Sequence, residues 1–136
     1  MVNNRRKPYE DIYTSYFGNM RNLPEDMIPI SICGKAPLWY KGLQYKKLAP
    51  KYHFFMEWKK THDNDYYIER YQKEVLNFLN VNEVIKELCG LVRTRYNDDV
   101  STIVLLCYEK PDEFCHRHLV FEWLTKNGFD SEEFNK

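Results

Sequence analysis

The stretch that decides the fold is Thr102-Ile103-Val104-Leu105-Leu106, which lies within the segment Val100–Leu106. This run is continuous, apolar and rich in β-branched side chains, as is typical of a strand buried on both faces in a parallel sheet. We therefore expect a central parallel strand at this position.

Two further strands are predicted upstream of this run. Ile12–Phe17 and Met27–Cys33 are β-rich stretches that end at glycine or glycine-asparagine turns. Because proline lacks a backbone N–H, we expect the second strand proper to begin after Pro29. Residues 35–50 lack clean periodicity, which predicts a long ordered loop.

Helical spacing of apolar residues predicts four helices between and after the strands. They cover residues 51–60, residues 63–79 with Asp63 or Asn64 as the cap, a segment capped by Asn82, and residues 113–126. The resulting order is strand, strand, helices, strand, helix. It predicts an α/β fold, namely a small Rossmann-like, mostly parallel sheet flanked by helices.

Length and composition indicate how many domains the chain forms and in which cellular compartment we expect it. The 136 residues suffice for one core, so we expect a flexible lead-in at 1–10, a single α/β domain at 11–128 and a solvated acidic tail at 129–136. The formal net charge is zero, so no global field draws the chain to nucleic acid or membrane. Because no segment approaches the roughly 20 apolar residues of a membrane helix, no membrane partner is expected. The chain begins without an export signal, so we expect a cytoplasmic location with reduced cysteines.

The carboxyl ends of the predicted strands bring chemistry-bearing residues together. In a parallel sheet, residues 17–19, 33–35 and 107–109 should converge where ligands bind. We expect Cys115 and His116 in the first turn of the last helix, where free N–H groups stabilise a thiolate or a bound phosphate. Arg117 adds a planar cation suited to phosphate. The sequence therefore predicts an anion pocket beside a sulfur nucleophile.

Several blocks of the chain resemble the family catalogued as domain of unknown function 488, from about Ile12 to Leu124. The most specific is Leu105-Leu106-Cys107-Tyr108-Glu109-Lys110-Pro111-Asp112-Glu113-Phe114-Cys115-His116-Arg117-His118-Leu119-Val120; the others are Ile30-Ser31-Ile32, Ala36-Pro37, Gly42, Tyr45-Lys46-Lys47-Leu48-Ala49-Pro50, Tyr67-Ile68-Glu69-Arg70-Tyr71 and Val75-Leu76. The resemblance implies a Rossmann-like domain linked to nucleotide or nucleic-acid metabolism and to phage–host conflict, without a defined reaction. Family members commonly carry a basic residue soon after the Ile-Ser-Ile strand, and Lys35 is its candidate here.

The preferred functional hypothesis is binding of a phosphorylated nucleotide or nucleotide-derived ligand at the strand ends, in the form of signal sequestration if the chain comes from a phage. Tyr108 or Trp39 would stack on the base. The candidate ligand-binding residues are Asn19, Lys35, Cys107, Tyr108, Glu109, Cys115, His116 and Arg117.

A second hypothesis is an enzyme that acts on a nucleotide or nucleic acid, with Cys115 or Glu109 as the catalytic residue. Whether the protein is an enzyme stays open, because the two thiols could equally be buried as small hydrophobes, and Arg117 could form a structural ion pair with Glu109. The Cys-x7-Cys spacing of Cys107 and Cys115 matches no standard zinc or thioredoxin-type motif. The sequence therefore predicts no metal site and no cofactor.

A third hypothesis is a nucleic-acid-binding accessory protein. The segment Lys35–Lys60 interleaves lysines with aromatic residues, which could contact phosphates and stack on bases. The same pattern is produced by aromatics packed in the core under lysine stems, and this second interpretation is the one we favour. Nucleic acid and a second copy of the chain both remain open as partners.

Overall fold

The computed structural model describes residues 12–96, 102–110 and 112–134. Within them, five strands form one sheet in the order β3-β2-β4-β1-β5, and every neighbouring pair is parallel. The strands are β1 (Ile12–Tyr16), β2 (Met27–Ser31), β3 (Leu43–Gln44), β4 (Thr102–Cys107) and β5 (Ser131–Glu133). The predicted Rossmann-like α/β fold with a parallel sheet is confirmed.

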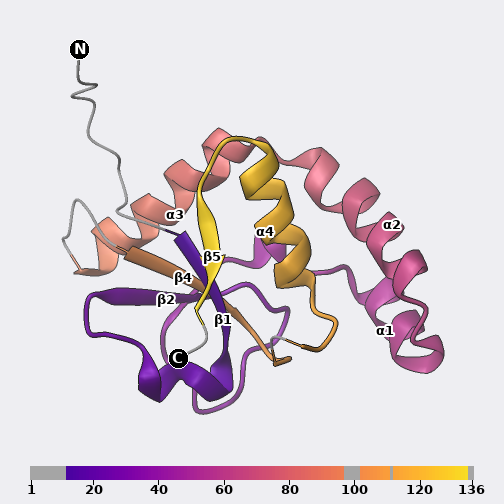
Figure 1. Ribbon diagram of the computed structural model, residues 1–136, viewed down its shortest axis with the longest axis horizontal. Helices are drawn as coiled ribbons and strands as arrows, with labels where there is room; N and C mark the ends of the chain where they lie inside the picture. The colour runs from indigo at the N-terminus through magenta and orange to yellow at the C-terminus, as the bar shows by residue number, and fades with distance from the viewer. Residues whose placement is uncertain (1–11, 97–101, 111, 135–136) are drawn as a thin grey trace.

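Four α-helices and three short 3-10 helices connect these strands in the described part of the chain. They are η1 (Phe17–Asn22), η2 (Lys46–Leu48), α1 (Tyr52–Thr61), α2 (Asn64–Glu74), η3 (Leu76–Phe78), α3 (Val81–Tyr96) and α4 (His116–Lys126). Figure 1 shows the α-helices gathered on one side of the sheet and η1 on the other. The sheet is therefore covered by helices on one face and by a 3-10 helix and loops on the opposite face.

β4 is the structural centre of the sheet, as its sequence predicts. It lies between β1 and β2, and all six of its residues are buried. Ile103 and Leu105 join the larger apolar core beneath the α-helices, whereas Val104 and Leu106 join the smaller core beneath η1. Because successive side chains of β4 point to opposite faces of the sheet, this strand contributes residues to both apolar cores.

β2 begins at Met27, so the prediction that it starts after Pro29 is wrong. Pro29 is aligned with Val104 of β4, whereas β3 pairs only with Ile30 and Ser31. The proline therefore lies in a part of β2 with a strand neighbour on one side only. An absent N–H is tolerated at such an edge position.

The long predicted second helix is divided in the structure. α2 ends at Glu74, and the chain turns through η3 before α3 begins. The side-chain oxygen of Asn80 accepts a hydrogen bond from the backbone N–H of Glu83 at 3.1 Å, which caps α3. The predicted cap, Asn82, lies inside the helix, so that prediction is wrong.

The segment predicted as a solvated acidic tail contributes to the sheet instead. β5 pairs in parallel with β1, and the backbone N–H of Phe134 donates to the carbonyl oxygen of Thr14 at 2.7 Å. This part of the expected tail is therefore a strand of the sheet, and it stays partly exposed to solvent. The predicted lead-in at 1–10 lies outside the described residues. Among the helices that the structure describes, none combines the length and the apolar character needed to cross a bilayer.

Candidate functional site

A pocket of about 430 Å³ opens where β2 and β4 end, bounded by α1, α2 and the loop before α4. Its lining residues are Cys33, Lys35, Pro50, Phe55, Trp58, Lys59, Tyr67, Tyr108, Glu109, Phe114 and His116. Such a volume and position match the usual ligand sites of open α/β sheets.

The three predicted segments do meet at this end of the sheet. The ring of Tyr108 lies 5.1 Å from that of Phe17, centroid to centroid. The Tyr108 hydroxyl donates a hydrogen bond to the carbonyl oxygen of Lys35 at 2.7 Å. Tyr108 therefore ties the loop after β4 to the chain that follows both β1 and β2.

One wall of the pocket is a cluster of three aromatic rings from three different elements. The Phe114 centroid lies 5.5 Å from that of Trp58 in α1 and 5.0 Å from that of Tyr67 in α2. Trp58 and Tyr67 are themselves in edge contact, at 5.9 Å. Sequence reasoning did not assign these residues to the site, because nothing in their spacing shows that α1, α2 and the loop before α4 converge.

The charged groups of the pocket are two lysines and one carboxyl. Lys35 and Lys59 are exposed at its rim, and Glu109 is half-buried. Burial is the main reason that the pKa of Glu109 is raised, and Arg117 and Lys59 partly oppose that rise. The pocket thus offers two cations beside a carboxyl group that ionises less readily than usual.

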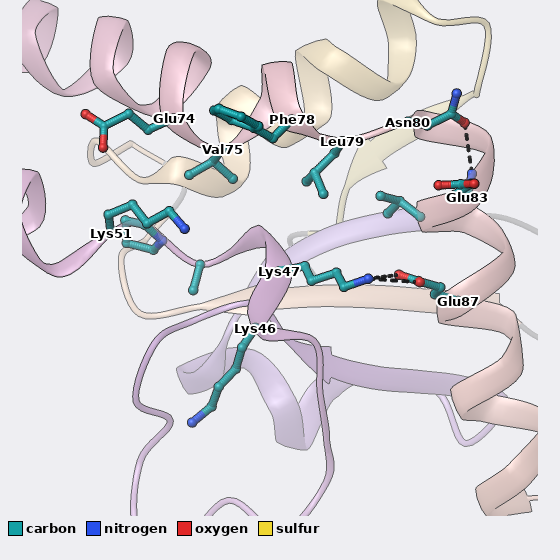
Figure 2. Close-up of a pocket in the computed structure, with 13 residues that line it drawn as sticks. Lys46, Lys47, Lys51, Glu74, Val75, Phe78, Leu79, Asn80, Glu83 and Glu87 are labelled. Atoms are coloured by element: carbon teal, nitrogen blue, oxygen red, sulfur yellow. Dashed lines mark hydrogen bonds and ion pairs between the residues drawn. The ribbon is translucent and has the colours of Figure 1, made fainter.

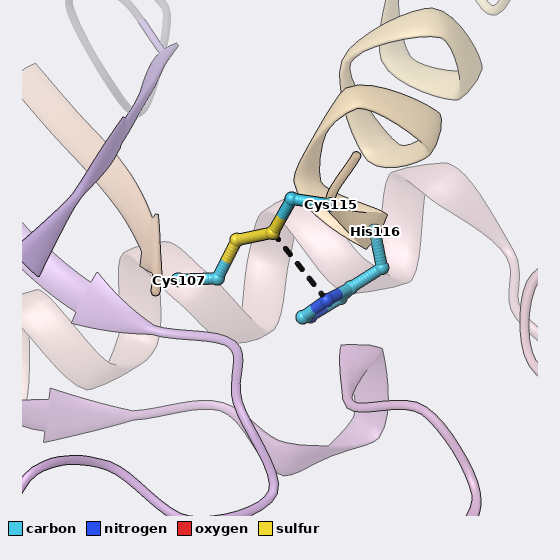
Figure 3. Close-up of side chains that lie close together, drawn as sticks. All are labelled: Cys107, Cys115 and His116. Carbon is cyan, nitrogen blue, oxygen red and sulfur yellow. Dashed lines mark hydrogen bonds between the residues drawn. A yellow bond between two sulfur atoms is a disulfide. The ribbon is translucent and has the colours of Figure 1, made fainter. Parts of the chain in front are cut away.

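His116 joins the pocket to the sulfur atoms behind it. Its Nε2 lies 2.8 Å from the carbonyl oxygen of Ile32, which can only accept, so Nε2 carries the hydrogen. Burial lowers the pKa of His116 to about 4, so the ring is neutral near pH 7. Its Nδ1 is then an acceptor and lies 3.9 Å from Cys115 Sγ, as Figure 3 shows.

Cys107 and Cys115 are joined by a disulfide in this structure (Figure 3). The expectation that all four cysteines are reduced thiols is therefore wrong for this pair. Cys107 ends β4, and Cys115 is the N-cap of α4 rather than a residue of its first turn. Their exposed fractions are 0% and 3%, and neither residue lines the pocket.

Arg117 is not available to a ligand, in contrast to its predicted role as a free anion contact. Its side chain is fully buried, and Nε and Nη2 donate to the Glu133 carboxylate at 3.1 and 2.8 Å. Nη1 donates to Cys107 Sγ at 3.3 Å and to the backbone carbonyl of Glu109. The alternative ion pair between Arg117 and Glu109 is also incorrect, because the partner carboxylate comes from β5.

Asn19 has a structural position too. It is buried, and its side-chain nitrogen donates to Ser15 Oγ and to the carbonyl oxygen of Phe134, both at 3.2 Å. Of the eight predicted ligand-binding residues, the pocket collects Lys35, Tyr108, Glu109 and His116 and leaves out Asn19, Cys107, Cys115 and Arg117. Trp39, the other predicted stacking residue, is exposed and does not line the pocket.

The aromatics of the lysine-rich segment are divided between core and surface. Tyr40, Tyr45 and Phe54 are buried, whereas Trp39 and Tyr52 are exposed. The core interpretation that we favoured therefore applies to the first three. A continuous stacking surface for a nucleic-acid strand would need more of these rings at the surface.

A second pocket, of about 420 Å³, lies between η2, η3 and α3 (Figure 2). Lys47 there is paired with Glu87, with 3.0 Å between Nζ and Oε2. Lysines and glutamates both line this pocket, and it has one aromatic side chain, Phe78. It therefore offers a ligand less aromatic stacking surface than the pocket at the strand ends.

Comparison with known proteins identifies a family for the chain, but it identifies no individual relative. A family model with the description "DUF488-N3a: Active DUF488-N3 subclade" matches residues 15–128. The match includes every residue that lines the strand-end pocket. No curated protein and no solved structure matches the chain.

Proposed function

The chain belongs to the family of domain of unknown function 488, and we propose that it binds a phosphorylated nucleotide or nucleotide-derived molecule in the strand-end pocket. The observation that carries this proposal is the combination of an aromatic wall with two rim lysines in one pocket of about 430 Å³. An aromatic wall suits a base, and ammonium groups suit phosphate.

The base stacks on the wall formed by Trp58 and Phe114, a contact worth roughly 1–3 kcal/mol for one base. The phosphate lies between Lys35 and Lys59 at the rim. This placement replaces the site predicted at the start of α4, where Arg117 is already neutralised by Glu133. Glu109, with its raised pKa, forms hydrogen bonds to polar groups of the base or sugar.

Binding without turnover would make the protein a sequestering agent. In the cytoplasm of an infected cell, it would lower the free concentration of a signalling nucleotide and so act in phage–host conflict. This role requires tight binding and slow release, and it requires no reaction.

The test is a thermal-shift and calorimetric panel on the full chain. Nucleoside monophosphates, diphosphates and cyclic nucleotides are each compared with the matching nucleoside. A ligand at 100 times its dissociation constant should stabilise the fold by roughly 2.7 kcal/mol. Phosphorylated members are expected to bind more tightly than their nucleosides, and a panel without any shift contradicts the proposal.

Trp58→Ala should weaken the best ligand about tenfold or more, because the stacking face is lost. Trp58→Phe, which keeps a ring, should retain most of the affinity. Trp39→Ala is the matched control, since Trp39 is 59% exposed and does not line the pocket. If Trp39→Ala and Trp58→Ala lost the same amount of ligand affinity, the base would not stack on the wall formed by Trp58 and Phe114.

A second candidate function is an enzyme that acts on the bound nucleotide, or on nucleic acid, through Cys115 in the form of the protein whose Cys107–Cys115 disulfide has been reduced. It is supported by the position of His116 Nδ1, 3.9 Å from Cys115 Sγ, and by a family model whose description reads "active". Glu109 is the acid or base on the pocket side. Cys115→Ser should abolish turnover and spare binding, whereas Cys89→Ser, in α3, should change neither. Turnover that survives Cys115→Ser excludes this candidate.

A further inference from the structure

Three buried side chains with metal-binding atoms meet behind the strand-end pocket. Cys107, Cys115 and His116 each offer one ligand atom, and these atoms lie within 4.8 Å of one another (Figure 3). Two sulfurs and one imidazole nitrogen form a donor set typical of zinc. The three residues come from the end of β4 and the start of α4, so the fold, rather than a short sequence motif, brings them together.

We propose that the reduced protein binds a zinc ion through Cys107, Cys115 and His116. A dithiol reductant transfers two electrons and two protons to the disulfide, which becomes two thiols while the reductant becomes a disulfide. Zinc then binds both sulfurs as thiolates and the imidazole through its lone pair, and the two thiol protons pass to solvent.

The orientation of His116 fits this role. Its Nε2–H donates to the carbonyl oxygen of Ile32 at 2.8 Å, which fixes the ring and directs Nδ1 toward the sulfurs. Metal-bound histidines almost always donate their other ring N–H to a carbonyl or a carboxylate. The hydrogen bond that orients a metal-binding histidine is therefore already present at Nε2.

The charges around the three residues also fit a divalent cation. Arg117 Nη1 lies 3.3 Å from Cys107 Sγ, where its N–H can donate to a thiolate. The charge of Arg117 is balanced by Glu133. Two thiolates would balance the zinc ion, so the filled site adds no net charge to a buried region.

The disulfide and the metal exclude each other, because sulfurs bonded to one another have no thiolate to offer. Disulfides inside cells are rare and commonly transient, so a reducing compartment favours the metal-binding state. Three protein ligands leave one position of a tetrahedral zinc for water or substrate. His116 also lines the strand-end pocket, which places the proposed metal next to the proposed nucleotide site.

The test uses the full chain, reduced with a phosphine and stripped of metal, and Co²⁺ as the spectroscopic probe. Reduced protein should take up cobalt in equimolar amount with a thiolate-to-cobalt charge-transfer band, and zinc should displace it. Cys107→Ser and Cys115→Ser should lose the band, whereas Cys89→Ser should keep it. His116→Gln should weaken binding about tenfold or more. Oxidised protein should take up none.

No cobalt uptake by reduced wild-type protein in which all four cysteines react as thiols would overturn the proposal. A band that persists unchanged in Cys115→Ser would do the same. If the serine variants fail to fold, alkylation of the wild type decides the matter. Zinc should slow alkylation of Cys107 and Cys115 but not of Cys89, and equal rates with and without zinc would refute the site. None of these readouts involves a nucleotide, so failure here leaves the proposed function intact.

Discussion

The guanidinium of Arg117 and the carboxylate of Glu133 form a two-pronged ion pair whose arginine side is fully buried, with contacts of 2.8 and 3.1 Å. Glu133 also accepts a hydrogen bond from the Thr14 hydroxyl at 2.5 Å. A buried arginine requires such a partner, because an unpaired charge inside the protein is costly. β5 therefore supplies the counter-charge for the start of α4.

Glu133→Gln should destabilise the fold by about 3 kcal/mol, because it leaves a buried guanidinium without its anion. Urea denaturation followed by circular dichroism measures the change. Glu132→Gln is the control, since Glu132 lies on the same strand with its side chain exposed. Equal stabilities of the two variants would contradict the structural role of the pair.

Lys59→Gln should lower affinity for a phosphorylated ligand and leave affinity for the matching nucleoside unchanged, because only the phosphate needs the cation. Lys60→Gln is the control, since this exposed neighbour does not line the pocket. Titration calorimetry at two salt concentrations measures both affinities. The loss should shrink at higher salt, because Lys59 is exposed and its charge is screened. A nucleoside affinity that falls as much as the nucleotide affinity would argue against a phosphate contact.

Gly42→Ala should destabilise the fold by about 1–3 kcal/mol. A Cβ at this position would lie 2.5 Å from Tyr40 Oη, and that hydroxyl is held by the carbonyl oxygens of Pro29 and Leu43. Gly90→Ala provides the opposite case, since a Cβ there meets nothing within 4 Å and Gly90 lies inside α3. It should stabilise by roughly 0.5–1 kcal/mol. Thermal unfolding of both variants tests the pair.

The pKa of Glu87 is lowered because Tyr45 donates a hydrogen bond to its carboxylate and Lys47 pairs with it. A carboxyl group whose pKa is lowered by folding stabilises the folded state at pH values above its pKa in the unfolded chain. That stabilisation is lost as the pH falls through its pKa in the folded protein. The difference in unfolding free energy between wild type and Glu87→Gln should therefore be largest near neutral pH and vanish well below about pH 4.

The side chain of Glu87 is 43% exposed, so solvent screening keeps this difference below about 1 kcal/mol. Urea midpoints measured from acid to neutral pH give the profile. Glu83→Gln, one turn earlier in α3, is the control for the loss of a surface charge. A difference between wild type and Glu87→Gln that grows toward low pH would have the wrong sign.

The fold could be predicted because the decisive signals are local. The run around Val104 is apolar on both faces, and only a central strand between two covered faces accommodates it. The same reasoning placed Tyr108 and Lys35 together, because the carboxyl ends of parallel strands share one edge of a sheet.

The rest of the site depends on contacts that spacing does not encode. Glu133 lies in a three-residue polar strand without an apolar pattern, so nothing in the sequence indicates that it pairs with Arg117. The aromatic wall joins Trp58, Tyr67 and Phe114 from three separate elements, and each ring resembles an ordinary core residue in sequence. The approach of Cys115 to Cys107 depends on where α4 begins, and helix boundaries are poorly determined by sequence.

The sheet order has a consequence for biosynthesis. β4 enters the sheet between β1 and β2, although it follows both of them and the three α-helices α1, α2 and α3 in the chain. While the nascent chain emerges, β1 and β2 have no strand to bridge them, and their open edges are able to pair with other chains. We expect folding to wait for β4 and to be slowed by this long-range pairing, so that the unfinished chain depends on chaperones.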